Sequence, residues 1–326
     1  MNFFLNIFKL FPPEVAHTLA LKSLNILYRT NLLKLFYKPV KTHDFNLLGL
    51  NFKNKLGVAA GLDKNGDYID SLGSLGFGFI EVGTVTPLPQ AGNSKPRMFR
   101  AFEDDAIINK LGFNNKGVDY LVNRLKKRIY TGIIGVNIGA NKSSTGNKRI
   151  EDYLICLRKV FNHCDYIAVN ISSPNTPQLR DLHSSNNIKE LVDAIENEYA
   201  KLETFKPIFL KISPDESYET IENISNLIES SSLSGLIVSN TTLDKSSLDK
   251  SKKNLEGGVS GAPLMKKSTE MIKKISTKHP SMPIIGVGGV LKKDDFLKKI
   301  EFGASLVQIY SGFIIKGPKI VNEILQ

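Results

Sequence analysis

Short apolar segments recur eight times along this chain, and most are followed by an amphipathic stretch with helical periodicity. The apolar segments are residues 56–60, 79–83, 133–138, 166–171, 207–212, 235–239, 283–287 and 306–310. The amphipathic stretches include residues 118–129, 188–202 and 218–228. Alternation of strand and helix implies parallel strands, and eight such units close a barrel. We therefore predict an α/β fold, a (β/α)8 TIM barrel.

Two features lie outside the regular repeat. Residues 45–50 and 52–56 predict a small hairpin before the first strand, and residues 85–115 and 241–263 form connections longer than usual. Long loops in compact domains often shape binding sites. A chain of 326 residues suits one barrel with a small appendage. We divide it into a helical segment, residues 1–41, and the barrel, residues 42–326.

The N-terminal segment is basic and apolar. Its charged residues are Lys9, Lys22, Arg29, Lys34, Lys38 and Lys41 against one acid, Glu14. Pro12 and Pro13 predict two short helices that meet there. The second has an apolar stripe made of Val15, Ala16, Leu19, Ala20 and Leu24. Such a helix lies in a membrane surface, or it packs its stripe on the main domain; both interpretations stay open.

Composition narrows the possible functions. Two cysteines without a Cys-x-x-Cys pair, and scattered histidines, argue for a reducing compartment and against zinc or an iron–sulfur cluster. No apolar run is long enough to cross a bilayer, and no export signal is recognisable. We therefore expect neither a membrane-spanning helix nor export. The net charge of +11 favours an anionic partner or reflects a lysine-rich, solvated surface. We expect no nucleic-acid partner.

Polar and small residues close the predicted strands. They are Gly61 with Lys64, Thr84, Asn137, Asn170, Lys211, Asn240 with Thr241, Gly288 with Gly289, and Tyr310 with Ser311. Because active sites of such barrels lie at the C-terminal ends of the strands, these residues should surround one mouth. Each alone could be a turn former.

The last two strands predict a phosphate site. Glycines at 286–289 and 310–312 allow backbone N–H groups to approach phosphate oxygens at the position where barrels commonly bind them. Lys211 should point into the barrel, where a buried ammonium needs an anion, such as the pyrimidine edge of a reduced flavin. A buried carboxylate is the alternative partner. No Rossmann or P-loop glycine motif is present.

Asparagines should surround the same mouth. They are Asn109, Asn137, Asn170, Asn175 and Asn240. Amides both donate and accept hydrogen bonds, so they suit a small planar heterocycle such as a pyrimidine.

Seven stretches carry a family resemblance. They are AAGLDK (59–64), EVGTVTP (81–87), NKLGFNN (109–115), NISSPNT (170–176), SNTT (239–242), PIIGVGG (283–289) and QIYSG (308–312). In this order they resemble the dihydroorotate dehydrogenases of the membrane-associated, quinone-dependent class. The resemblance implies an FMN-dependent flavoprotein that oxidises (S)-dihydroorotate to orotate in pyrimidine biosynthesis and passes the electrons to a membrane quinone. Ser239 stands where the family usually has threonine, which keeps the hydroxyl.

The resemblance also implies site residues. Cofactor contacts would be Ala60, Gly61, Lys64, Thr84, Asn137, Asn170, Lys211, Ser239, Gly261, Gly289, Tyr310 and Ser311. Substrate contacts would be Lys64, Asn109, Lys110, Leu111, Gly112, Phe113, Asn170, Asn175, Asn240 and Thr241. Ser173 matches the catalytic base, with Thr176 and Phe113 in its relay. The soluble class has cysteine at that place.

The N-terminal segment acquires a role from the same resemblance. His17, Arg100 and Tyr310 match quinone contacts, and the two helices would rest on the cytoplasmic face of the cell membrane as a peripheral attachment. We expect a monomer. Two alternatives stay open: another FMN barrel, such as a dihydropyrimidine or tRNA dihydrouridine reductase, and a non-catalytic membrane-surface protein that uses the barrel as a phosphate-binding scaffold.

Overall fold

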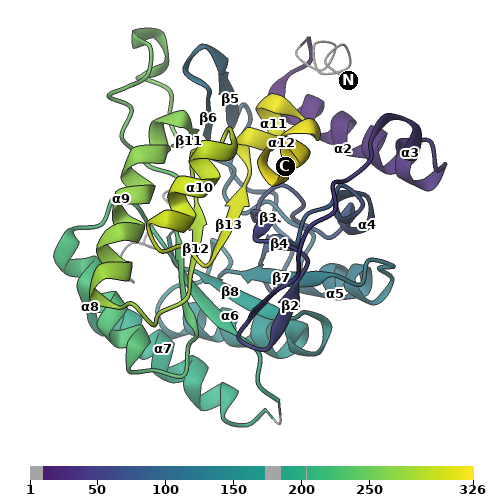
Figure 1. Cartoon of the computed structure of the whole chain (residues 1–326). Coiled ribbons are helices and arrows are strands. Elements are labelled where there is room, and N and C mark those ends of the chain that lie inside the picture. Colours follow the sequence, from purple (N-terminus) through teal and green to yellow (C-terminus); the bar gives the residue numbers. More distant parts are fainter. Residues whose placement is uncertain (1–9, 173–184, 203) are drawn as a thin grey trace.

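Eight parallel strands close a barrel in the computed structural model, which describes residues 10–172, 185–202 and 204–326 (Figure 1). In the order in which they neighbour one another they are β3 (Leu56–Val58), β4 (Phe79–Val85), β7 (Ile133–Ile138), β8 (Tyr166–Asn170), β9 (Ile208–Ile212), β10 (Gly235–Val238), β12 (Ile284–Val287) and β13 (Leu306–Ile309). β13 pairs in parallel with β3 and completes the ring. The predicted barrel and all eight of its predicted strands are confirmed.

Aromatic side chains fill the barrel at the N-terminal ends of its strands. The ring centroids of Phe79 and Tyr166 lie 6.3 Å apart, and those of Tyr166 and Phe209 lie 5.8 Å apart. Phe52 packs edge-on against Phe79 from below, at 5.5 Å. Such edge-to-face pairs stabilise a core beyond the area they bury. Aromatic rings therefore close this end of the barrel.

Phe52 belongs to the predicted hairpin, which is shorter than expected. Its strands are β1 (Phe45–Leu47) and β2 (Leu50–Phe52), and they pair antiparallel. The turn falls at Leu48 and Gly49, whose φ angles are +51° and +77°. The sequence-based boundary near residue 51 was wrong, because Leu48 adopts a left-handed conformation that few leucines take.

Helices surround the barrel. They are α4 (Ile69–Gly73), α5 (Val118–Lys126), α6 (Asn147–Val160), α7 (Ser185–Tyr199), α8 (Tyr218–Glu229), α9 (Ala262–Lys278), α10 (Lys293–Glu301), α11 (Ser311–Lys316) and α12 (Lys319–Leu325). In α8, Ile221, Ile224 and Ile228 recur at helical spacing and are buried against the strands. Burial of each such side chain contributes about 1.5–3 kcal/mol.

A second sheet lies over the open end of the barrel. β5 (Met98–Ala101), β6 (Ala106–Asn109) and β11 (Gly258–Gly261) form three antiparallel strands, with β6 in the middle. These strands lie in the two long connections, residues 85–115 and 241–263, which were expected to be loops. Each strand has only four residues, and β6 and β11 are far apart in the chain, so no local pattern revealed the pairing.

The N-terminal segment packs beside this sheet. α2 (Pro13–Arg29) buries Ala16, Leu21 and Leu24 and contacts α4 and β5, and α3 (Leu33–Phe36) follows it. Packing on the main domain is therefore shown for part of the stripe, while Val15 stays 45% exposed. The expected first helix lies outside the described residues. In the described chain, no helix combines the length and the apolarity needed to span a bilayer.

Candidate functional site

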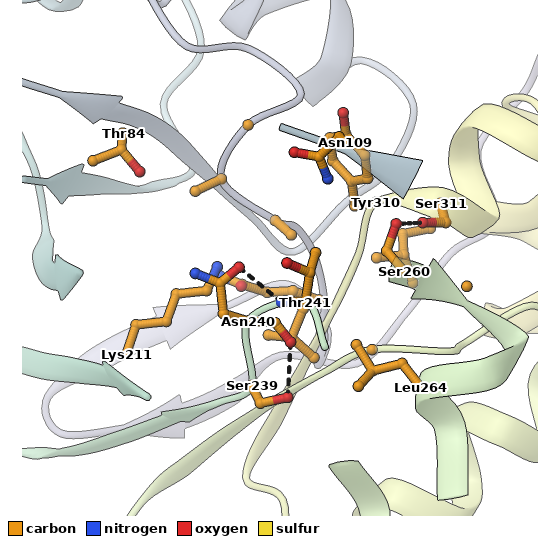
Figure 2. Close-up of a pocket in the computed structure, with 18 of the residues that line it drawn as sticks. Thr84, Asn109, Lys211, Ser239, Asn240, Thr241, Ser260, Leu264, Tyr310 and Ser311 are labelled. Atoms are coloured by element: carbon orange, nitrogen blue, oxygen red, sulfur yellow. Dashed lines mark hydrogen bonds between the residues drawn. The ribbon is translucent and has the colours of Figure 1, made fainter. Parts of the chain in front are cut away.

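A polar cavity of about 130 Å³ lies at the C-terminal ends of the barrel strands, under the three-stranded sheet (Figure 2). The predicted site residues that line it are Ala60, Gly61, Lys64, Thr84, Asn109, Leu111, Gly112, Phe113, Asn170, Lys211, Ser239, Asn240, Thr241, Gly261, Gly289, Tyr310 and Ser311. They come from seven strand ends and from two strands of the sheet above. The fold therefore brings distant segments to one mouth.

The remaining predicted residues lie elsewhere or outside the described chain. Asn137 is fully buried beneath the cavity, and Lys110 directs its ammonium to Glu256 at 2.6 Å. Neither lines the cavity. Ser173, Asn175 and Thr176 lie outside the described residues, so their placement is not tested.

Several lining residues were not foreseen. They include Ala59, Ser260, Leu264, Val290, Gln308 and Ile309. Ser260 belongs to the unexpected sheet. Gln308 carried a signal, because it is a polar residue in the middle of an apolar strand.

A chain of buried amides fixes the floor of the cavity. Asn170 Nδ2 donates to Thr84 Oγ1 at 3.0 Å and to Asn137 Oδ1 at 3.2 Å, and Thr84 donates to the same Asn137 oxygen. Asn137 Nδ2 in turn donates to Glu81 Oε1 at 2.8 Å. With both ends held, Asn170 has one orientation, which is a requirement for a precise binding site.

Glu81 organises the layer below. Its other oxygen accepts hydrogen bonds from Tyr166 at 2.9 Å and from Gln308 Nε2 at 2.7 Å, although the carboxylate is fully buried. Gln308 Oε1 is buried and has no partner among the described residues. Because an unsatisfied buried acceptor is costly, this oxygen marks a place where a ligand donor fits.

Lys211, on β9, points into the cavity (Figure 2). Burial lowers the pKa of its ammonium, and the nearby charge of Glu81 partly opposes that effect. Within the described residues, Lys211 Nζ has no hydrogen-bond or ion-pair partner. The buried carboxylate considered as an alternative partner therefore acts on Lys211 only from a distance. A buried cation with free donors favours a ligand that presents an acceptor.

Lys64 supplies a second, partly buried cation. Its Nζ donates to the Gly61 carbonyl at 3.0 Å. Burial lowers the pKa of Lys64 to about 8, although the neighbouring charge of Glu14 partly opposes that effect. A ligand carboxylate here would restore the charged form and gain a charge-assisted hydrogen bond.

The opposite end of the cavity is built from backbone. Gly288 and Gly289 have φ angles of +112° and +79°, which few other residues adopt, and Ser311 Oγ donates to Ser260 Oγ at 2.8 Å. α9, a helix of 17 residues, begins at this end. Glycine backbone, hydroxyls and a helix N-terminus together suit a phosphate group.

Asn240 is held from the neighbouring strand. Asn240 Nδ2 donates to Ser172 Oγ at 3.0 Å, and Ser172 Oγ donates to Asn170 Oδ1 at 3.0 Å.

Phe113, on the far wall, adopts a φ angle of +52°, which is unusual for an aromatic residue and typical of strained functional loops.

A second cavity, of about 460 Å³, is apolar and lies between α2, α3, β5, β6 and α11. Its lining includes Ala16, His17, Ala20, Leu21, Leu24, Leu27, Phe36, Leu62, Met98, Arg100, Ile107, Phe313 and Ile314. His17 Nε2 donates to the Leu62 carbonyl at 3.0 Å, and Arg100 Nη1 donates to the Phe11 carbonyl at 2.8 Å. Two of the three predicted quinone contacts thus meet here.

Tyr310, the third, lines the polar cavity instead. Its hydroxyl is buried and has no partner in the part of the chain that the structure describes. Among those residues there is also no cluster of His, Cys, Asp or Glu that could hold a metal ion.

Comparisons with known proteins agree with this geometry. A sequence model described as dihydroorotate dehydrogenase matches residues 43–326. A curated relative from Buchnera aphidicola subsp. Schizaphis graminum, named dihydroorotate dehydrogenase (quinone), is 49% identical over 97% of this chain and 96% of its own length. One of the same name from Saccharophagus degradans is 46% identical over 95% and 93%.

Solved structures give the same result. The ligand-free DHODH from Eimeria tenella superposes with a TM-score of 0.86 at 34% identity, over 94% of this chain and 92% of that one. The DHODH from Eimeria tenella in complex with ferulenol has a TM-score of 0.85 at 33% identity, over 96% and 89%. The chain therefore belongs to the dihydroorotate dehydrogenase family, in its quinone-dependent class.

Proposed function

We propose that this enzyme oxidises (S)-dihydroorotate to orotate with FMN in the polar cavity, and that a membrane quinone in the apolar cavity reoxidises the flavin. The observation that carries the proposal is the pair of cavities, one polar and one apolar, which share the segment 61–64 as a wall. The names of the relatives, dihydroorotate dehydrogenase (quinone), support the same substrates and favour them over those of other flavin barrels.

The residues present fit FMN. The Lys211 ammonium offers donors, and Gln308 Oε1 offers an acceptor that has no partner among the described residues. These groups match the carbonyl and N–H groups of a flavin pyrimidine edge. Gly289, Ser260 and Ser311 would bind the phosphate. The family is flavin-dependent, and when bound FMN supplies the hydride acceptor. Lys211 would favour the reduced flavin by placing a positive charge beside that edge.

Dihydroorotate would lie between the flavin and the loops above. Lys64 would pair with its carboxylate, while Asn109, Asn170 and Asn240 would donate to and accept from its ring amides. The substrate loop Asn109–Phe113, together with Thr241, would complete the wall.

Ser173 would remove the proton from the substrate ring. A serine hydroxyl is a weak base at neutral pH, so it needs an oriented substrate and a relay, which Thr176 and Phe113 would complete. Ser173 and Thr176 lie outside the described residues, and their roles rest on the sequence motif at 170–176. The described neighbour Ser172 is hydrogen-bonded to Asn170 and Asn240, two proposed substrate contacts.

The quinone would enter the apolar cavity with its head group towards His17 and Arg100. Apolar walls with a few polar groups suit a lipid-like electron acceptor. Tyr310 would lie between this head group and the flavin, because it lines the polar cavity and belongs to the strand end that leads into α11.

The N-terminal segment, residues 1–41, would attach the enzyme peripherally to the cytoplasmic face of the cell membrane. Its apolar side chains are unusually exposed: Leu10 by 83%, Ile26 by 61%, Leu35 by 75% and Phe36 by 66%. Lys22, Arg29, Lys34, Lys38 and Lys41 lie in the same segment and are exposed too. A segment that exposes both apolar and basic side chains suits anionic lipid. We propose a monomer, since the described residues of one chain line both cavities.

Purification in mild detergent tests the assignment. We expect a yellow protein that releases FMN on denaturation and oxidises dihydroorotate with a short-chain quinone as acceptor but not with NAD. A colourless preparation that stays inactive after incubation with FMN would contradict the proposal.

A further inference from the structure

An ion pair between a buried arginine and a partly exposed glutamate joins the N-terminal helix to the barrel. Arg97 Nε lies 3.2 Å from both carboxylate oxygens of Glu14, and Nη2 lies 2.6 Å from Oε1. The Arg97 side chain is only 7% exposed. Although burial favours the protonated carboxyl, the hydrogen bonds and charge of Arg97 hold the pKa of Glu14 below its usual value. Glu14 is therefore charged at neutral pH.

The same guanidinium organises a loop. Its remaining nitrogen, Nη1, donates to the carbonyls of Ala91 and Asn93, at 2.5 and 2.9 Å. Five N–H donors in one plane allow arginine to bind a carboxylate on one edge and carbonyls on another. Arg97 thus links α2, through Glu14, to the segment 91–93.

That segment supports the proposed substrate loop. Asn93 N donates to the Leu111 carbonyl at 3.1 Å, and Asn93 Nδ2 donates to the Lys110 carbonyl at 3.0 Å. Lys110 N returns a hydrogen bond to the Arg97 carbonyl at 2.9 Å. Leu111 is a lining residue of the polar cavity.

The contact between the two loops leaves no free space. A Cβ atom on Gly92 would lie 2.3 Å from the Leu111 carbonyl oxygen, and one on Gly112 would lie 2.9 Å from Asn93 N. A shift of the segment 91–93 must therefore move Leu111 and Gly112 as well. Interfaces of this kind transmit displacement because close-packed groups cannot absorb it.

We propose that the Glu14–Arg97 pair is a positioning device through which the docking of α2 sets the affinity of the polar cavity for its substrate and product. In the described chain, neither residue lines either cavity, yet the pair connects a wall of each: Ala16 and His17 on α2 line the apolar cavity, and Leu111 and Gly112 line the polar one. Loss of the Glu14 charge would leave a buried guanidinium uncompensated and free it to rearrange.

The inference rests on the proposed function, because it takes orotate as the ligand of the polar cavity. The test is calorimetric titration of the FMN-loaded enzyme with orotate. We expect Glu14→Gln to weaken orotate binding about 3- to 30-fold. FMN content should stay unchanged, and the KM for dihydroorotate should rise while kcat changes less than about twofold, a pattern expected when uniform binding is lost.

Matched variants separate positioning from general damage. Arg158 and Glu198 form a similar bidentate pair between α6 and α7, at 2.7 and 2.9 Å, so Glu198→Gln removes an equivalent contact and should leave orotate binding unchanged. The double variant Glu14→Gln/Arg97→Gln should bind orotate no more weakly than Arg97→Gln alone, because the two residues act as a unit. Glu14→Asp keeps the charge and should give an intermediate loss if Glu14→Gln does not fold.

Wild-type orotate affinity in Glu14→Gln, or in Glu14→Asp where that is the folded variant, would overturn this inference and leave the proposed function intact. Equal weakening by Glu198→Gln would overturn it too, because the effect would then not be specific to α2. A wild-type enzyme that carries FMN but does not bind orotate would remove the proposed function and this inference together.

Discussion

Lys64 and His17 lie on opposite sides of one short segment. Lys64 Nζ donates to the Gly61 carbonyl at 3.0 Å, and His17 Nε2 donates to the carbonyl of the next residue, Leu62, also at 3.0 Å. Lys64 lines the polar cavity and His17 lines the apolar one. The two cavities are thus separated by little more than one stretch of backbone, a short path for electrons between the proposed flavin and quinone.

Orotate binding should weaken above pH 8. Burial lowers the pKa of Lys64 to about 8, so the free enzyme holds the ammonium below this pH and loses it above. Because an ammonium binds a carboxylate and a neutral amine does not, the affinity should fall about tenfold for each further pH unit. Calorimetry between pH 6 and 10 measures this. In Lys64→Gln, orotate should bind weakly at every pH; an unchanged pH profile in that variant would remove Lys64 from the role.

Replacement of His17 should affect only the quinone reaction. Burial, assisted by the charge of Lys64, lowers the pKa of His17 to about 4, so the ring is neutral across the physiological range. We expect His17→Ala to raise the KM for a short-chain quinone about tenfold, the value of one lost polar contact. Rapid-mixing measurement should find reduction of the flavin by dihydroorotate unaltered, and slowing of that step would contradict the assignment.

Ser173→Ala should keep FMN but lose about 10²- to 10⁴-fold in the rate of flavin reduction, the usual contribution of a general base. The neighbouring Ser172→Ala is the matched control. Ser172 is hydrogen-bonded to Asn170 and Asn240, so its loss should mainly raise the KM for dihydroorotate. Stopped-flow absorbance separates the two effects, and full activity of Ser173→Ala would exclude it as the base.

Lys299 should make stability rise with pH. It is buried against the hydroxyls of Ser268 and Thr269, at 2.7 and 3.1 Å, and burial lowers its pKa to about 7 from an ordinary 10.5. Between these values the unfolded chain binds a proton that the folded chain does not, so the free energy of unfolding increases with pH across this window. Denaturant unfolding at pH 7 and 9.5 should show the increase in wild type and a smaller one in Lys299→Met. An equal increase in wild type and in Lys299→Met would show that Lys299 does not cause the pH dependence.

The barrel was predictable because its signal is local. Each strand is a short apolar run between turn residues, and the amphipathic stretches between them have the period of a helix. The second sheet was not predictable from the sequence, because β6 pairs with β11 through Ile107 and Ser260, which lie far apart in the chain. Local patterns cannot indicate such pairings.

The candidate site, too, was predictable only in part. Lys211 was found because a buried cation needs a partner, and Lys64 because it follows the end of a predicted strand. The glycines of the phosphate end were found because of their place on the last strands. Glu14 was noted only as the one acid of the basic N-terminal segment, since its contact with Arg97 depends on how α2 docks. Motif resemblance supplied the roles of Ser173 and Thr176, which no physical pattern in the sequence would have assigned.

The central claim, that one flavin connects two different substrates, is tested most directly by two half-reactions without oxygen. Dihydroorotate is added first to the purified enzyme while the flavin absorbance is followed, and then a short-chain quinone or NAD is added. We expect bleaching with dihydroorotate, recovery with the quinone and none with NAD. A flavin that dihydroorotate does not bleach, or that NAD reoxidises as fast as the quinone, would contradict the claim.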